Sequence, residues 1–108
     1  MTRRIVVEPD AERELVAARD WYSERRAGLG QAFIEAVNEA MKRIATIPEA
    51  STPVPGVAPE LGARRVFVKR FPYSVVFIEV GELLSVVAFA HQRRRPGYWM
   101  ARLGTPDD

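Results

Sequence analysis

The sequence predicts an α+β domain in which a helical hairpin packs on one face of a mainly antiparallel sheet. A short β-branched run comes first, two segments with apolar residues at helical spacing follow, and three further β-branched runs come last. Helices and sheet each carry an apolar surface, and each needs the other to cover it. A chain of 108 residues has the length of one domain. We expect that domain to span residues 1–103, with a short tail over 104–108.

The first strand and the first helix are predicted over residues 4–8 and 10–26. Pro9 separates them, and we expect Asp10 to be the N-cap of the helix because a short acidic side chain accepts hydrogen bonds from free backbone N–H groups. Trp21 lies beside the apolar stripe and is expected to pack in the core. The stripe itself consists of Ala11, Leu15, Ala18 and Tyr22.

A second helix is predicted over residues 29–47, between a break that contains Gly28 and a stop at Pro48. Two helices joined by so short a turn should form an antiparallel hairpin. The apolar face of the second helix consists of Leu29, Phe33, Val37, Ala40, Met41, Ile44 and Ile47.

A loop rich in proline and glycine is predicted over residues 48–63, and strands over 64–70, 74–80 and 83–90. The dipeptide Gly81-Glu82 indicates a hairpin between the last two strands. The strand 74–80 carries four consecutive apolar residues, so we expect it to be central and buried on both faces. The strand 4–8 should join the sheet at a margin, beside a neighbour that the sequence does not fix.

Composition excludes several classes of protein. The sequence has no cysteine and one histidine, which excludes a disulfide framework and argues against a metal site. No apolar run reaches the roughly twenty residues that cross a membrane, and the basic N-terminus is not followed by the apolar stretch of a secretory signal. We therefore expect a soluble, cytoplasmic protein without cofactor or metal.

Charge is unevenly distributed along the chain. Residues 1–60 hold eight basic and ten acidic residues, a net charge of −2, whereas residues 61–102 hold eight basic and two acidic residues, a net charge of +6. Fourteen of the sixteen basic residues are arginine, which binds carboxylates and phosphates in a bidentate manner. The basic half indicates either an anionic partner or a solvated surface.

The segment from His91 to Arg102 contains no acid and mixes arginine with Tyr98 and Trp99. Arginine beside aromatic rings is typical of interface hot spots, although Trp99 can equally fold back on the sheet to close the core. His91 can orient the segment through a hydrogen bond at the end of the last strand. Truncation after Arg95 is expected to leave the fold mostly intact and to remove the activity of the protein.

In three places the sequence resembles toxins of the RelE/ParE superfamily. Residues 11–15 (AEREL) lead to Trp21-Tyr22, residues 66–73 read VFVKRFPY before an aliphatic run, and residues 87–99 read VAFAHQRRRPGYW. The last segment is very similar to the ending of ParE-like plasmid-stabilisation toxins. The order and spacing of all three, over nearly the whole chain, make the resemblance specific to the superfamily, whereas the ParE-like branch is indicated mainly by the segment from His91 to Trp99.

This resemblance implies the toxin of a type II toxin–antitoxin pair. Such a toxin is held inactive in a hetero-oligomer by an antitoxin whose acidic, amphipathic C-terminal segment wraps it. Free ParE-like toxins poison DNA gyrase without catalysis, whereas RelE-like toxins cut mRNA in the ribosome. Two further possibilities are a degenerate, non-toxic antitoxin-binding module and a small DNA-binding regulator.

The resemblance assigns candidate residues to each role. In the ParE-like reading no catalytic residue is expected. Cleavage of RNA requires a base, an acid and cations for the phosphorane charge, and the candidates are His91, Arg65, Lys69, Arg93 and Tyr98, with Arg64 and Arg95 as further cations. The residues expected to contact the target are His91, Arg93, Arg94, Arg95, Tyr98 and Trp99. The residues expected to bind the antitoxin are Arg13, Arg19, Trp21, Arg25, Arg64 and Arg65.

Overall fold

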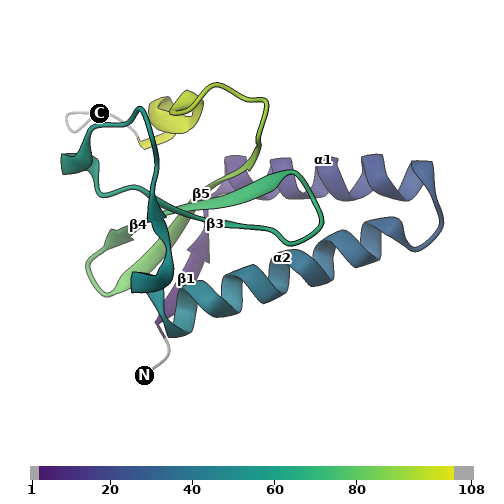
Figure 1. The fold of residues 1–108 in the computed structure, drawn as a ribbon, viewed down its shortest axis with the longest axis horizontal. Helices are drawn as coiled ribbons and strands as arrows, with labels where there is room; N and C mark the ends of the chain where they lie inside the picture. Colours follow the sequence, from purple (N-terminus) through teal and green to yellow (C-terminus); the bar gives the residue numbers. More distant parts are fainter. Residues whose placement is uncertain (1–2, 104–108) are drawn as a thin grey trace.

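The computed structural model describes residues 3–103, and the predicted tail 104–108 lies outside them. A helical hairpin lies against a five-stranded sheet and extends beyond it (Figure 1), which confirms the predicted α+β class. The elements in chain order are β1 (Arg4–Val7), α1 (Pro9–Arg25), α2 (Leu29–Thr46), η1 (Pro48–Ala50), β2 (Thr52–Pro53), η2 (Pro59–Leu61), β3 (Arg64–Phe67), β4 (Tyr73–Val80), β5 (Leu83–His91) and η3 (Tyr98–Leu103). No helix among the described residues is long and apolar enough to cross a membrane.

Helix α1 begins one residue earlier than the sequence predicted. Pro9 is the first helical residue and Glu8 the N-cap, and no side chain caps this end. The expectation that Asp10 is the N-cap is therefore wrong. Proline suits the first helical position because its fixed φ is helical and its missing N–H would have no partner there.

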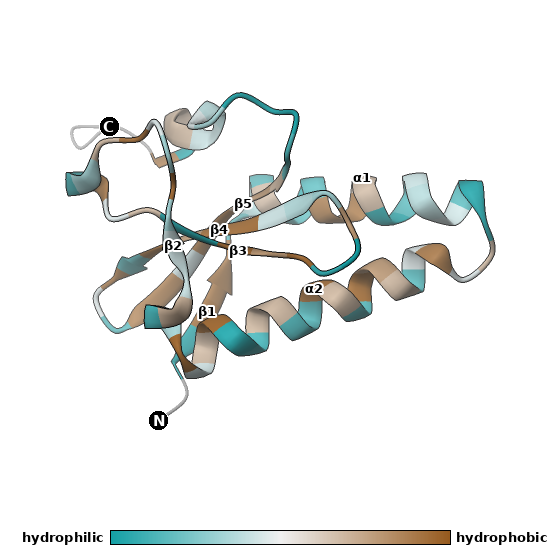
Figure 2. Cartoon of the chain, viewed as in Figure 1, coloured by the Kyte–Doolittle hydropathy of each residue, from teal (hydrophilic) through white to brown (hydrophobic). Residues whose placement is uncertain are grey.

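The two helices pack through the predicted stripes. Phe33, Val37 and Ile44 of α2 are buried against the sheet, and the hydropathy of α2 changes from its inner to its outer side (Figure 2). Gly30 is a point of close approach between α1 and α2, because a Cβ added there would lie 2.7 Å from the carbonyl oxygen of Arg19.

Trp21 of α1 does not pack in the core, because it is 51% exposed. The expectation of a core tryptophan is wrong because the side chain at position 21 lies at the surface and lines a groove beside α1.

The sheet has the order β1-β5-β4-β3-β2. Strand β1 lies at a margin, as predicted, and pairs parallel with β5, while the other pairs are antiparallel. Strand β4 is central, also as predicted. The segment 48–63 is not only a loop, because β2 forms within it and pairs with β3. Proline at position 53 is compatible with this strand because β2 is at the edge, where a missing N–H costs no ladder hydrogen bond.

Strand β3 ends at Phe67, three residues earlier than predicted. Lys69 and Arg70 instead form a turn in which Arg70 has a φ of 72°, and the Val68 N–H donates to the Tyr73 carbonyl. This turn reverses the chain into β4. Lys69 therefore lies in an exposed turn and not in the sheet.

A bulge in β5 changes which residues face the helices. Val76 pairs with Ala88 and Phe77 with Val86, so Val87 has no counterpart in β4. Val86 and Phe89 both belong to the core under the helices, whereas Val87 and Ala88 belong to a second core on the opposite face. An extra residue in one strand reverses the alternation of side chains beyond it. The sheet therefore has apolar residues to cover on both faces.

The C-terminal segment covers the second face. Trp99 is 1% exposed and packs with Val76, Val87 and Ala88. This confirms that Trp99 folds back to close the core. Truncation after Arg95 would remove this cover and open the core, because a buried aromatic ring contributes about 3–5 kcal/mol. The expectation that such a truncation leaves the fold mostly intact is therefore wrong.

Candidate functional site

The candidate site begins with an unpaired edge of β5. Strand β1 ends at Val7, opposite Val86, because Pro9 already belongs to α1. Residues of β5 beyond Val86 therefore have no neighbouring strand on that side. Free backbone N–H and C=O groups at such an edge require other partners.

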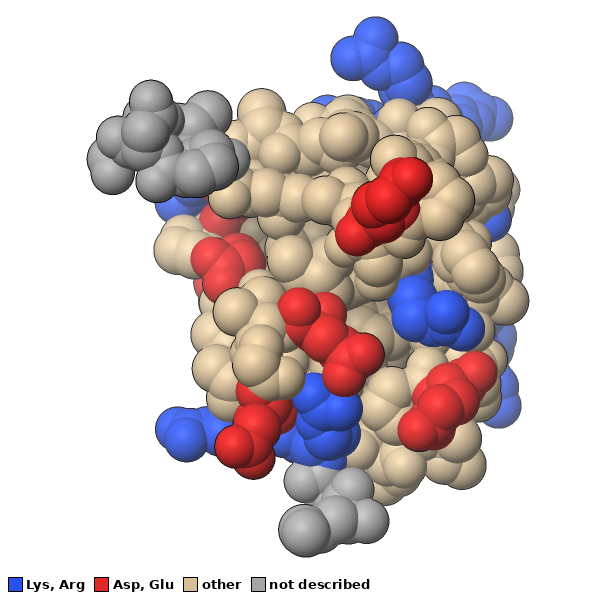
Figure 3. Space-filling model, turned by 90° about the vertical axis from the view of Figure 1, so that its left-hand side faces the viewer, with Lys and Arg blue, Asp and Glu red and all other residues tan. Residues whose placement is uncertain are grey.

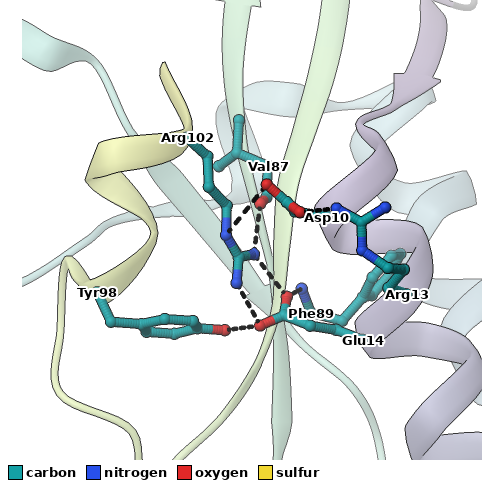
Figure 4. Close-up of polar contacts among 7 residues, drawn as sticks. All are labelled: Asp10, Arg13, Glu14, Val87, Phe89, Tyr98 and Arg102. Atoms are coloured by element: carbon teal, nitrogen blue, oxygen red, sulfur yellow. Dashed lines mark hydrogen bonds and ion pairs between the residues drawn. The ribbon is translucent and has the colours of Figure 1, made fainter. Parts of the chain in front are cut away.

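The carboxylate of Glu14 supplies a partner at this edge (Figure 4). Glu14 Oε1 accepts a hydrogen bond of 3.0 Å from the Phe89 N–H, and Oε2 accepts one of 2.5 Å from the Tyr98 hydroxyl. Arg102 donates to both oxygens at 2.9 Å, and its Nη1 also donates to the Val87 carbonyl at 3.2 Å. We call Glu14, Tyr98 and Arg102 the Glu14 clamp. It joins α1, β5 and η3.

The clamp raises the pKa values of Tyr98 and Arg102. Burial raises the pKa of Tyr98 well above its ordinary value of 10, and the hydrogen bond to Glu14 raises it further. The hydrogen bond to Glu14 also raises the pKa of Arg102. Glu14 and Arg102 are 18% and 20% exposed, so solvent screens this ion pair only partly. At neutral pH Tyr98 is a protonated donor, which makes it unsuited to act as a general base.

A groove of about 670 Å³ lies between α1 and the C-terminal segment. Its floor is formed by small and aromatic side chains, and two arginines lie on the side of the C-terminal segment. The lining residues are Glu14, Ala17, Ala18, Trp21, Tyr22, Pro72, Tyr73, Phe89, His91, Arg93, Arg94 and Tyr98. We call this the α1 groove.

Arginine–aromatic stacking shapes both sides of the α1 groove. The Arg25 guanidinium lies 3.7 Å from the centre of the Trp21 ring, and the Arg94 guanidinium 3.8 Å from that of Tyr98. Such cation–π contacts hold flat surfaces that a partner can cover.

By contrast, acidic and basic side chains are interspersed at the end of the molecule farthest from the α1–α2 turn (Figure 3).

His91 has the orienting role that the sequence suggested. Its Nδ1 accepts a hydrogen bond of 3.1 Å from the Arg93 N–H, and its ring stacks edge-on against Tyr73 at 5.1 Å. An accepting Nδ1 places the proton of the neutral ring on Nε2. The imidazole therefore fixes the start of the C-terminal segment.

The structure places the predicted target-binding residues on two adjoining surfaces. His91, Arg93, Arg94 and Tyr98 line the α1 groove. A smaller cavity of about 100 Å³ is lined by Arg95 and is shared by His91, Arg94 and Tyr98. Trp99 is buried in the second core, which corrects the expectation that its side chain contacts a target directly.

The predicted antitoxin-binding residues are dispersed. On α1, Trp21 lines the groove, and Arg13, Arg19 and Arg25 form ion pairs with Asp10, Asp20 and Glu24. On β3, Arg64 and Arg65 are adjacent and so point to opposite faces. Arg64 donates to the hydroxyl and carbonyl oxygens of Ser51 and thereby joins β3 to β2. No single surface uses all six residues.

The predicted RNase residues are only partly assembled. His91, Arg93 and Tyr98 share the α1 groove, and His91 and Tyr98 share the smaller cavity with Arg65. Lys69 is exposed in the β3–β4 turn and lines neither. Within residues 3–103, no group of three or more His, Asp or Glu side chains is arranged to hold a metal ion.

Sequence reasoning missed Glu14 and Arg102 as site residues. One signal was present, because Glu14 lies three residues after Ala11 and four before Ala18, on the stripe that was predicted to be buried. A carboxylate on the buried side of a helix needs a cation or donors. The sequence does not say which arginine supplies the charge.

Comparisons with known proteins relate this chain to toxins. Residues 5–96 match the family model described as the ParE toxin of the type II toxin–antitoxin system parDE. The fold is similar to a solved structure described as the chromosomal ParDE toxin–antitoxin system from P. aeruginosa, with a TM-score of 0.67 and 18% identity over 83% of this chain and 96% of that one. Comparison with curated protein sequences gives no match.

The clamp predicts unusual alkaline titration. The three tyrosines, Tyr22, Tyr73 and Tyr98, all have pKa values raised by burial. Above about pH 10 the native protein therefore keeps protons that the unfolded chain has lost. Rising pH then favours the unfolded chain, so the free energy of unfolding is unaffected by these groups below pH 10 and falls as the pH rises above it. We expect tyrosinate absorbance of the native protein to rise at higher pH than that of the denatured protein.

Glu14→Gln should lower the pKa of Tyr98, which loses a charged hydrogen-bond acceptor, and to a smaller extent that of Tyr73, so that part of the tyrosine titration moves to lower pH. The matched variant Glu12→Gln, which alters an exposed acid of the same helix, should leave the curve unchanged. A titration curve of Glu14→Gln identical to that of the unaltered protein would contradict this account of the clamp.

Proposed function

This chain belongs to the ParE toxin family of type II toxin–antitoxin systems, and on that premise we propose that it is a gyrase-poisoning toxin neutralised by a cognate antitoxin. The observation that carries the proposal is the α1 groove, in which an apolar floor meets the exposed arginines of the C-terminal segment. We place the protein in the cytoplasm, where gyrase and DNA are.

The antitoxin is expected to occupy the α1 groove. Its acidic, amphipathic segment would place apolar side chains over Ala17, Ala18 and Trp21 and carboxylates beside Arg93 and Arg94. A volume of about 670 Å³ suits a few anchoring side chains of a peptide. Recognition of one helical or extended segment in a groove depends on such anchors.

A non-catalytic mode of action is supported by how the candidate acids and bases are used. The Tyr98 hydroxyl donates to Glu14, and the Nδ1 of His91 accepts from the Arg93 backbone. Both groups serve to fix the C-terminal segment. We therefore propose that Arg93, Arg94 and Arg95 act through binding to gyrase or to its DNA.

Neutralisation would follow from shared residues. Arg93 and Arg94 line the groove that we assign to the antitoxin and also belong to the proposed target surface. A segment that fills the groove covers both. Toxin bound to antitoxin would therefore be unable to engage its target.

Replacement of Trp21 by alanine tests the antitoxin seat. A half-exposed tryptophan at the centre of an interface contributes at least about 2 kcal/mol, so the affinity for a peptide of the antitoxin's acidic C-terminal segment should fall about thirtyfold. Isothermal titration calorimetry measures this. Ile47→Ala removes another exposed apolar side chain from the far end of α2 and should not change the affinity. Equal affinities of the two variants would place the antitoxin elsewhere.

Expression of the toxin without antitoxin tests the target. We expect growth arrest with filamentation and DNA-damage signalling, and purified gyrase should lose supercoiling activity and accumulate cleaved DNA. Replacing Arg93, Arg94 and Arg95 together by glutamine should abolish both effects. The control replaces Arg4, Arg26 and Lys42 by glutamine, which removes the same charge from other surfaces, and should remain toxic.

Other outcomes would contradict the gyrase proposal. Stalled translation with codon-specific mRNA cuts that His91→Ala abolishes would indicate a ribosome-dependent endonuclease. Absence of any growth phenotype would indicate a degenerate antitoxin-binding module.

A further inference from the structure

The side chain of Arg65 lies on the face of the sheet opposite the helices. Arg65 pairs with Val76 across the β3–β4 ladder, and Val76 belongs to the second core. The Arg65 guanidinium lies 4.9 Å from the centre of the Phe67 ring, two residues along the same strand. Phe67 is 55% exposed. A cation and an exposed aromatic ring are therefore adjacent on this face.

Arg65 has no polar partner within residues 3–103. None of its side-chain atoms takes part in a hydrogen bond or an ion pair there, and its Nε is buried and unpaired. The neighbouring Arg64, by contrast, donates to two oxygen atoms of Ser51. A buried donor without an acceptor costs about 1–3 kcal/mol, so such groups are rare in folded proteins.

The small cavity beside Arg65 is lined by basic and neutral polar side chains on an apolar base that includes Val76 and Trp99. Arg65, Arg94, Arg95 and His91 contribute the basic groups, and Ser74 and Gln92 contribute further donors. None of its lining residues is acidic. Its volume of about 100 Å³ suits one small ligand group. We call it the Arg65 cavity.

We propose that the Arg65 cavity binds one phosphate group of a nucleic-acid backbone. Three arginines around one small space match the charge and the multiple acceptors of a phosphate. The exposed Phe67 ring offers a stacking surface for an adjacent base, a contact that tolerates any sequence. An acidic peptide would supply the charge but would leave this ring without a stacking partner. The proposal does not depend on gyrase, because it concerns the isolated toxin.

A direct test observes Arg65 in the unaltered protein. The side-chain Nε–H signal of Arg65, assigned by nuclear magnetic resonance, should shift and saturate as inorganic phosphate is added. The Nε–H of Arg26, an exposed arginine at the end of α1, is the internal control and should not follow that curve. An unchanged Arg65 signal would overturn the proposal, and this result needs no variant that might misfold.

A second test measures the affinity of the full-length toxin for a fluorescent single-stranded DNA oligonucleotide. Arg65→Gln should weaken binding about tenfold, because a hydrogen bond to a charged group is lost, and should reduce the salt dependence by about one phosphate contact. Arg26→Gln removes the same charge on the helical side and should have little effect. Equal effects of the two variants would overturn the proposal.

Two further ligands show whether the cavity binds a nucleic-acid phosphate or a protein carboxylate. An RNA of the same sequence should bind about as well as the DNA if the cavity takes a backbone phosphate without reading bases. A poly-glutamate peptide should compete poorly. Binding of the peptide, but not of either oligonucleotide, would reassign the cavity to a protein carboxylate and contradict the proposal.

Discussion

The carboxylate of Glu14 is the interaction on which the arrangement of the molecule depends. Strand β1 is short because Pro9 begins a helix, and the second half of β5 is therefore left without a neighbour. Glu14 accepts the Phe89 N–H at this edge, and Arg102 donates to the Val87 carbonyl of the bulge. The same carboxylate binds Tyr98 and Arg102, so one side chain both satisfies the sheet edge and fixes the C-terminal segment.

Fixing this segment has two structural consequences. On one side it forms a wall of the α1 groove, and on the other it places Trp99 over the second core. The arginines at positions 93–95 lie between His91, which bonds the start of the segment, and the buried Trp99. All three arginines are exposed on the surface. Under the proposed function, a partner that fills the groove would cover Arg93 and Arg94 and so block their contact with the target.

The division of arginines supports this view of the molecule. Arg13, Arg19 and Arg25 of α1 have carboxylate neighbours within the chain, and so does Arg102. In the described residues, no ion pair involves Arg65 or the arginines at 93–95. Cations without internal partners are the ones available to an anionic ligand. The antitoxin and the nucleic acid that we propose would draw on this second group.

Much of the fold follows from local patterns in the sequence. Apolar spacing predicts both helices to within one residue of their bounds, and Gly81-Glu82 predicts the β4–β5 hairpin. Strand β2 was not predictable because it exists only through pairing with β3, in a segment rich in proline. The bulge at Val87 was not predictable either, since periodicity within one strand does not reveal an extra residue relative to its neighbour.

The site was predictable only in its composition. The sequence indicates that arginines and aromatic residues gather near the C-terminus, and the structure shows which of them share a surface. Trp21 is 51% exposed and Trp99 is 1% exposed, and this difference depends on tertiary packing, because Trp99 is covered only when the C-terminal segment lies on the second core. Glu14 required knowledge of an edge that only the finished sheet creates.

Hydrogen exchange of the C-terminal segment in Glu14→Gln tests the central role of this carboxylate most directly. The amides of residues 92–103 should exchange at least about tenfold faster than in the unaltered protein, because opening of the segment becomes easier by about 1.4 kcal/mol or more. The amides of β4 should keep their protection, as should all amides in Glu12→Gln. Unchanged protection of residues 92–103 in Glu14→Gln would show that the segment is held by Trp99 alone and would contradict the account.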